Sequence, residues 1–191
     1  GSAGPTPFHI PTDPAARTAL FRHYIRTGNR FYAEKAGYTS FRKSLHYFDS
    51  AQALANLTGD TAMLADAVFA RGRVYDAWNR EPLQTVRFFT EAAALLARVP
   101  GRRAEHLYVR QLVAHAYEKA HDTTGALRVL RSLYAETIAL PPAARDTLRF
   151  LPEGALIATG VGAFSLADSI LAHLVRRPAI VNDPESYPYL D

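Results

Sequence analysis

The chain has 191 residues, of which 48% are hydrophobic and 21% are charged, and its formal net charge at pH 7 is +4. These values are typical of a globular domain or a short repeat array. The chain contains no cysteine, which excludes disulfides, thiolate nucleophiles and cysteine-ligated zinc. Its arginines are scattered in ones and twos, whereas nucleic-acid binding needs a dense basic stripe, so we expect no nucleic-acid partner. No window reaches the roughly 18 to 20 apolar residues of a membrane helix, so we expect no membrane contact.

The sequence divides into a lead-in, a long helical region and a short terminal segment. Residues 1–13 combine a stretch that resembles an expression-tag remnant with a proline-rich lead-in, which we expect to be extended. Asp13 followed by Pro14 predicts a helix start, because aspartate caps helices and proline is favoured at the first helical position. We expect a helical repeat domain over residues 14–177. Residues 178–191 are expected to form a linker and the start of a truncated further helix.

Apolar residues recur every three or four positions from Pro14 to about Val175, and no stretch alternates in the manner of a β-strand. Glycine, proline and polar residues interrupt this pattern at Gly37-Tyr38, 58–60, 79–82, Pro100-Gly101, 121–125, Pro141-Pro142, 160–162 and Arg177-Pro178. These breaks predict helices of roughly 12 to 18 residues. Alternate breaks lie about 34 to 41 residues apart, as in helix-turn-helix repeats. The sequence therefore predicts an all-α fold of antiparallel helix-turn-helix repeats.

Small and aromatic residues fall at matching places in successive units. The first unit has Ser44, Phe48 and Ala51; the second has Gly72, Tyr75, Phe89 and Ala92 before Pro100. The third unit has Ala114, Tyr117, Ala126, Leu127, Leu130 and Leu133, and the fourth has Ala155, Ala158, Ala167, Leu171 and Leu174. Small residues let two helices approach closely, and a large side chain then fills the gap against the next helix.

This arrangement resembles the tetratricopeptide repeat over roughly residues 23–175. It departs from the family pattern by one extra residue in the turn before Pro82 and by aliphatic residues in place of aromatic ones in the third unit. The resemblance implies a short right-handed solenoid that binds a partner and does not catalyse a reaction. An unrelated helical bundle is the alternative.

Short arrays of this appearance also resemble the sensory regions that precede the membrane helix of two-component sensor histidine kinases and related regulators in Bacteroidetes bacteria. This resemblance implies a sensory or interaction region of a larger bacterial signalling protein, which would be periplasmic. The alternative is a general assembly scaffold or adaptor of a cytosolic or secretion complex, in which case the chain would be cytoplasmic. The residues that follow Asp191 would distinguish the two.

The sequence lacks the common motifs of catalysis. It contains no His-Glu-x-x-His zinc motif, no Gly-x-Ser-x-Gly nucleophile elbow and no lysine after a phosphate-binding glycine loop. Gly160-Val161-Gly162 resembles the start of a dinucleotide-binding turn, but Ser165 stands where the third glycine would be. A turn between packed helices explains these glycines better. We therefore expect this chain to have no enzymatic activity, no metal and no cofactor; an enzyme whose site lies outside these motifs is the weaker alternative.

The candidate site is the groove lined by the first helix of each unit. In the phase assigned above, its side chains are Arg26, Asn29, Phe69, Arg73, Asp76, Tyr108, Gln111, His115, Glu118 and Arg149. Arg73, Tyr108 and His115 combine a fixed cation, an aromatic surface and an imidazole, which suits an acidic partner or an extended peptide. We expect a protein or peptide in this concave groove, or a small ligand, and a homodimer is also open. A merely solvated surface is the alternative interpretation.

One subfamily of these repeats binds the terminal carboxylate of chaperone tails with paired lysine, asparagine and arginine side chains. The matching positions in this sequence hold Asn29, Ala33, Ala70, Tyr108 and Leu112. They retain one amide and no cation, so a chaperone co-factor is not expected.

Overall fold

The computed structural model describes residues 10–34, 37–79, 81–141 and 150–175, and these residues are 84% helical with no strands. The helices are α1 (Pro14–Glu34), α2 (Tyr38–Thr58), α3 (Thr61–Trp78), α4 (Pro82–Leu96), α5 (Arg103–Lys119), α6 (Thr123–Ile138), α8 (Phe150–Gly160) and α9 (Phe164–Val175). The predicted all-α class is confirmed. The predicted segment 178–191 lies outside the described residues.

The helix boundaries follow local capping chemistry. Helix α1 begins at Pro14, as predicted, and the Ala16 backbone N–H donates to the Asp13 carboxylate at 2.8 Å. Helix α2 ends at Thr58, and its C-cap Gly59 has a φ of +68°, in the left-handed region that glycine adopts without strain. Asp60 then caps α3 by accepting a hydrogen bond from the Met63 N–H at 2.9 Å.

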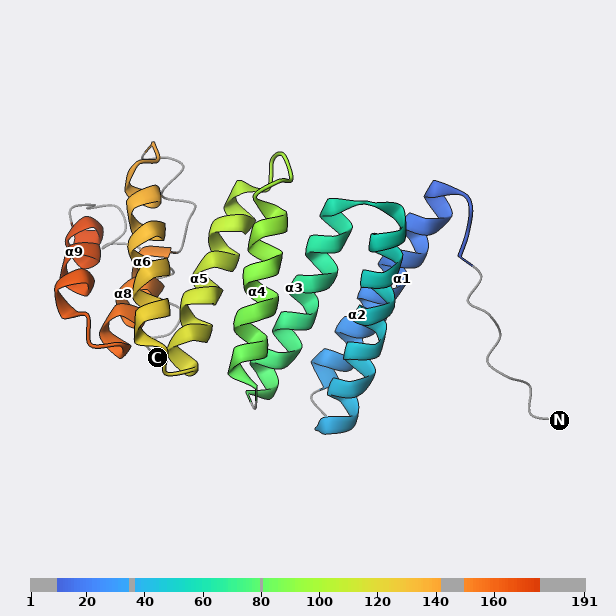
Figure 1. The fold of residues 1–191 in the computed structure, drawn as a ribbon, viewed down its shortest axis with the longest axis horizontal. Helices are drawn as coiled ribbons and strands as arrows, with labels where there is room; N and C mark the ends of the chain where they lie inside the picture. Colours follow the sequence, from blue (N-terminus) through green and yellow to red (C-terminus); the bar gives the residue numbers. More distant parts are fainter. Residues whose placement is uncertain (1–9, 35–36, 80, 142–149, 176–191) are drawn as a thin grey trace.

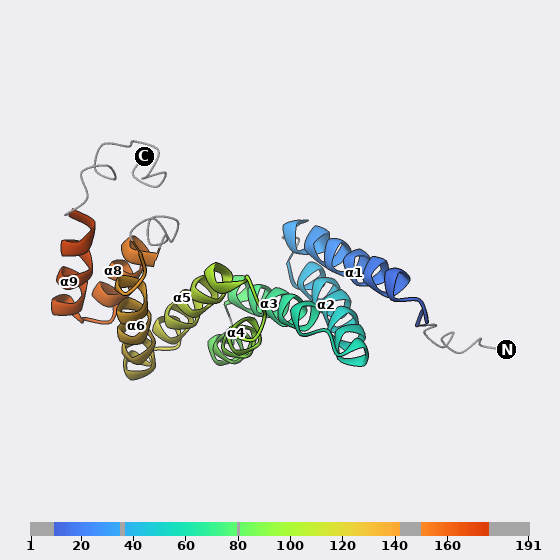
Figure 2. The ribbon, with the colours of Figure 1, turned by 90° about the horizontal axis from the view of Figure 1, so that it is seen from above.

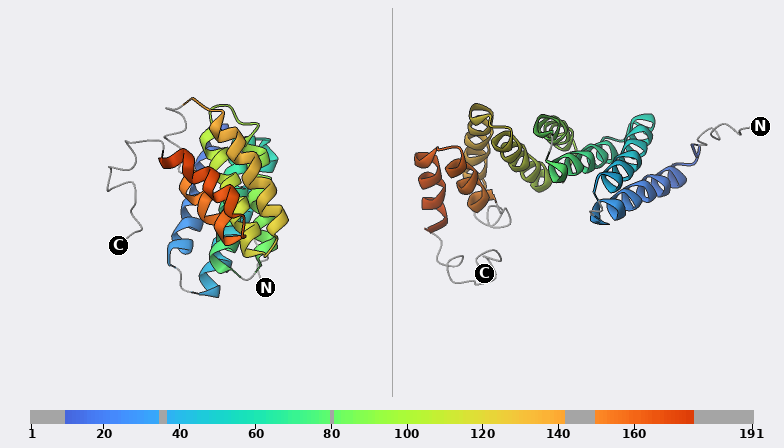
Figure 3. Two further views of the ribbon diagram at one scale, coloured as in Figure 1. Left: turned by 90° about the vertical axis from the view of Figure 1, so that its left-hand side faces the viewer. Right: turned by 90° about the horizontal axis from the view of Figure 1, so that it is seen from below.

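The helices stand side by side in chain order, and consecutive helices from α1 to α6 pack against each other (Figure 1). Seen from above, α1, α3, α5 and α8 lie on one side of the row and α2, α4 and α6 on the other (Figure 2). The view from below shows the same order (Figure 3). The molecule is therefore a short solenoid of antiparallel helix pairs.

Two glycines bring the helices of the first two pairs into close contact. A β-carbon built on Gly28 would lie 2.5 Å from the Phe48 ring, and one built on Gly72 would lie 2.6 Å from the Phe89 ring. The Ser44 hydroxyl donates to the Gly28 carbonyl at 2.8 Å, which satisfies a buried polar group at this contact. Small residues in one helix thus accommodate large rings from the other.

The second helices repeat this packing with a constant spacing of 41 positions. Phe48, Phe89 and Leu130 are each almost fully buried, whereas Leu171, the next residue in the series, is 44% exposed. Phe48 packs with Ala70 and Val74 of the following helix, and Leu130 packs with residues of α8. Among the described residues no helix follows α9, which accounts for the exposure of Leu171.

The core is divided into clusters that follow one another along the row. One contains Phe48, Ala70 and Val74, a second lies between α1, α2 and α3, a third between α3, α4 and α5, and a fourth between α5, α6, α8 and α9. Leu64 and Val129 each contact two clusters. No helix in the described part of the chain is both long and apolar enough to cross a membrane.

The predicted helix lengths are partly wrong. Helices α1 and α2 have 21 residues each and α8 has 11, outside the expected range of roughly 12 to 18. Gly28 lies inside α1 and does not end the helix. A glycine is needed at this position because the Phe48 ring approaches closely, and not because the chain turns. This glycine supplies the small first-helix position of the first unit.

Candidate functional site

A groove of about 890 Å³ lies between α1 and α3 and is closed at one end by the start of α5. Of the predicted site residues, Arg26 and Asn29 line it from α1, and Phe69 and Arg73 line it from α3. Apolar side chains lie between the polar ones. These are Phe21, Ile25, Met63 and Phe69. The groove therefore offers charged groups beside an apolar floor.

Arg102, which precedes α5, closes one end of the groove through two carboxylates. Its guanidinium lies 2.7 Å from Asp66 Oδ1 and also pairs with Glu105. The hydrogen bond from Arg102 lowers the pKa of Glu105 below its ordinary value. Burial raises the pKa of Asp66, because the loss of solvation outweighs the attraction of Arg102. One arginine thus pairs with both carboxylates, and the pKa of Asp66 is raised while that of Glu105 is lowered.

Three further arginines line the groove but form no ion pair with the described residues. Arg22 and Arg26 are exposed on α1, and Arg73 is half-buried on α3 with its guanidinium 4.7 Å from the Tyr32 ring centroid. Within the described ranges, no aspartate or glutamate forms an ion pair with any of the three. This part of the groove carries positive charge without a compensating carboxylate from the described chain.

The remaining predicted residues do not line this groove. Tyr108, which is 52% exposed, borders it through an edge-to-face contact with Phe69 at 6.4 Å between ring centroids. Gln111 is only 8% exposed and presents little surface. Asp76 pairs with Lys119 at 2.8 Å, and His115 Nδ1 lies 3.0 Å from Glu118. Arg149 lies outside the described residues.

Sequence reasoning missed four charged groups that line the groove: Arg22, Asp66, Arg102 and Glu105. Helical spacing contains a signal for two of them. Arg22 lies four residues before Arg26, and Asp66 lies seven residues before Arg73, so each shares a helix face with a predicted residue. Arg102 lies in the turn before α5, so helical spacing does not predict that it lines the groove.

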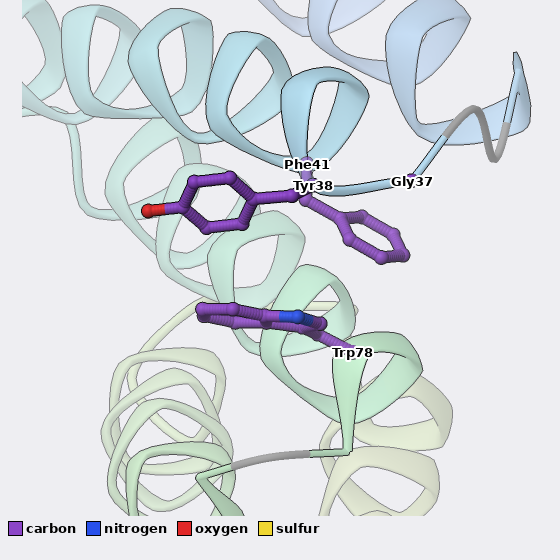
Figure 4. Close-up of a pocket in the computed structure, with 4 residues that line it drawn as sticks. All are labelled: Gly37, Tyr38, Phe41 and Trp78. Atoms are coloured by element: carbon purple, nitrogen blue, oxygen red, sulfur yellow. The ribbon is translucent and has the colours of Figure 1, made fainter.

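A second cavity, of about 580 Å³, lies between the first two hairpins and is lined by Gly37, Tyr38, Phe41 and Trp78 (Figure 4). The Tyr38 and Trp78 rings have centroids 5.3 Å apart and are tilted by 37°. Tyr38 is 56% exposed, and Arg42 lies over its ring at 5.8 Å. We call this cavity the aromatic slot.

Within the described part of the chain, no group of three or more histidine, aspartate or glutamate side chains is arranged to hold a metal ion. Comparisons with protein-family models, with curated proteins and with solved structures find no match to this chain.

Proposed function

We propose that this chain is a non-catalytic binding module that holds an extended acidic segment of a partner protein in the groove between α1 and α3. The observation that carries the proposal is the set of Arg22, Arg26 and Arg73, which line one groove without ion-pair partners among the described residues. A guanidinium binds a carboxylate through two parallel hydrogen bonds, so such a set favours acidic side chains.

The dimensions of the groove support an extended ligand. Its α1 wall runs from Thr18 to Asn29, which corresponds to about 16 Å at the helical rise of 1.5 Å per residue. An extended peptide advances about 3.3 Å per residue, so about five ligand residues span this wall. Alternate ligand side chains would then meet the arginines and the apolar floor of Ile25, Met63 and Phe69.

The packing supports a module of the tetratricopeptide type. The contacts of Gly28 with Phe48 and of Gly72 with Phe89 place a small first-helix residue against a second-helix ring, as the family pattern requires. The spacing of 41 positions between second helices is longer than the 34 residues of that repeat. The likeness therefore lies in the helix contacts and not in the repeat length.

For the setting of this module, the sequence resemblance supports the sensory or interaction region of a larger bacterial signalling protein. The sequence after Asp191 in the full-length protein tests this. An apolar helix of about 20 residues followed by kinase-type segments would support it, whereas further helix pairs would favour an assembly scaffold.

The groove assignment can be tested with a labelled eight-residue peptide that alternates glutamate and alanine, hereafter the parent peptide, and its lysine counterpart. We expect the glutamate peptide to bind and the lysine peptide not to bind, as measured by fluorescence anisotropy. Arg26→Ala and Arg73→Ala should each weaken binding by more than about 1 kcal/mol, as the loss of an arginine that the ligand covers commonly does. The melting transition should change little.

The matched control is Arg131→Ala, which removes an exposed arginine of α6 that has no ion pair among the described residues. Equal losses in all three variants would mean that the peptide responds only to net charge, and the groove assignment would then be wrong.

A further inference from the structure

We propose that the aromatic slot receives an aromatic side chain of the same acidic segment, so that the partner is held at two points. This inference rests on the proposed function of the groove and adds a requirement for the ligand: an aromatic residue a short distance from its acidic residues.

The slot is formed by the first turn of α2 and the last turn of α3. Tyr38 and Phe41 project from α2, and Trp78 from α3, with the Tyr38 and Trp78 rings facing each other (Figure 4). Apart from Gly37 itself and its chain neighbours, no described residue has an atom within 4 Å of the position that a β-carbon on Gly37 would take, so the described residues leave the slot open on that side. Because these two rings already contact each other, only their outer faces and their edges are available to a further ring, and offset or edge-to-face contacts there are favourable.

Charge around the slot decides between an aromatic ligand and a cationic one. Aromatic walls also suit ammonium groups, but none of the four lining residues carries a carboxylate, and Arg42 already lies over the Tyr38 ring. A cationic ligand would therefore be repelled by Arg42. An aromatic side chain with a neighbouring carboxylate would instead place its ring in the slot and its charge near Arg42.

The slot and the groove are connected by contacts along α1 and α3. Arg73, in the groove, stacks on Tyr32, and both Tyr32 and Phe41 pack against the cluster of Phe48, Ala70 and Val74. Trp78 follows Arg73 by five residues, which is about 7.5 Å along the axis of α3 and about 140° around it. An extended ligand covers the axial distance with about two or three residues, and it needs further residues to pass around α3 to the slot.

The experiment compares the parent peptide with two derivatives that carry phenylalanine in place of alanine near one end or the other, so that both chain directions are covered. We expect one derivative to bind at least about fivefold more tightly than the parent peptide. Tyr38→Ala should remove this gain and leave the dissociation constant of the parent peptide unchanged. Phe164→Ala, which removes an exposed ring of α9, should leave both the phenylalanine gain and the dissociation constant of the parent peptide unchanged.

Trp78 gives a second measurement on the unaltered chain, since it is the only tryptophan. Its emission should change with the tighter phenylalanine derivative and not with the parent peptide. This result is independent of whether the Tyr38 variant folds.

The outcomes separate the two proposals. If both derivatives bind as the parent peptide does, while binding still depends on Arg26 and Arg73, the slot assignment is wrong and the groove assignment stands. If the phenylalanine gain depends on Tyr38 but neither arginine matters, the groove assignment is wrong and the slot remains as an aromatic site. If no peptide binds, both are wrong.

Discussion

Gly28 and Gly72 set how closely the helices of the first two pairs approach. Because a β-carbon at either position would lie within 2.6 Å of a buried phenylalanine ring, alanine requires the core to shift. Overpacking of this kind costs about 1 to 3 kcal/mol, whereas alanine gains only about 1 kcal/mol in helix propensity. We therefore expect Gly28→Ala and Gly72→Ala to lower the free energy of unfolding on balance, and Gly72→Leu to lower it further, in denaturant melts.

The control for this prediction is Arg98→Ala, an exposed change that should stay within about 0.5 kcal/mol. If the glycine variants are as harmless as this control, the close contacts do not limit the packing.

The two carboxylates that share Arg102 should give opposite pH dependences. Folding lowers the pKa of Glu105, so its contribution to stability is present above the ordinary glutamate pKa and is lost as pH falls through the lowered value. Folding raises the pKa of Asp66, so its ionisation costs stability, and this cost disappears as pH falls through the raised value.

Thermal melts between about pH 3 and pH 7 test this pair. Relative to Glu105→Gln, the unaltered protein should lose stability on acidification; relative to Asp66→Asn, it should gain. If the stability differences between each variant and the unaltered protein change with pH in the same direction, the opposite pKa shifts of Glu105 and Asp66 are wrong.

Part of the groove was predictable because a helix repeats its faces every three to four residues. Arg26, Asn29, Phe69 and Arg73 were placed by this rule, and the structure brings them into one groove. His115 and Glu118 follow the same rule but do not line the groove, because its walls are mainly α1 and α3. The slot escaped prediction because its walls come from the ends of two helices that belong to different pairs.

At the scale of whole helices, aspartate caps fix where α3 and α6 begin. Asp60 accepts from the Met63 N–H, and Asp122 accepts from the Gly125 N–H at 2.8 Å. We expect Asp60→Ala to cost about 1 kcal/mol in denaturant melts, because one backbone donor loses its partner. Asp60→Asn should retain nearly all the stability, since asparagine caps equally well. Equal losses for both would point to the charge of Asp60 and not to its cap.

The helix breaks were readable from sequence because each has a local cause. Gly59 and Asn79 adopt positive φ, and Asp60, Pro82 and Asp122 mark starts. Helix lengths were less predictable, since an interior glycine such as Gly28 is explained only by a residue 20 positions away, Phe48. Local chemistry therefore indicates where helices stop, and tertiary contacts decide which glycines do not stop them.

Across the whole molecule, the row of clusters implies that stability is local. Leu133 is fully buried in the cluster between α5, α6, α8 and α9, far along the chain from the clusters of α1 and α2. We expect Leu133→Ala to cost about 2 to 5 kcal/mol and to lower the hydrogen-exchange protection of α5, α6, α8 and α9 much more than that of α1 and α2.

Leu156→Ala is the matched control, because this leucine is 67% exposed on the neighbouring α8. A uniform loss of protection after Leu133→Ala would show that the solenoid unfolds as one cooperative unit.

The exposure of Leu171 has a consequence for engineering. It occupies the place that Phe48, Phe89 and Leu130 hold in earlier pairs, each shielded by a helix that follows. A duplicate of the α3–α4 hairpin fused after α9 would present Ala70 and Val74 to Leu171, as α3 presents them to Phe48. The constant spacing of 41 positions defines the length of such a cassette, so binding surfaces could be multiplied along one chain by copying a natural module.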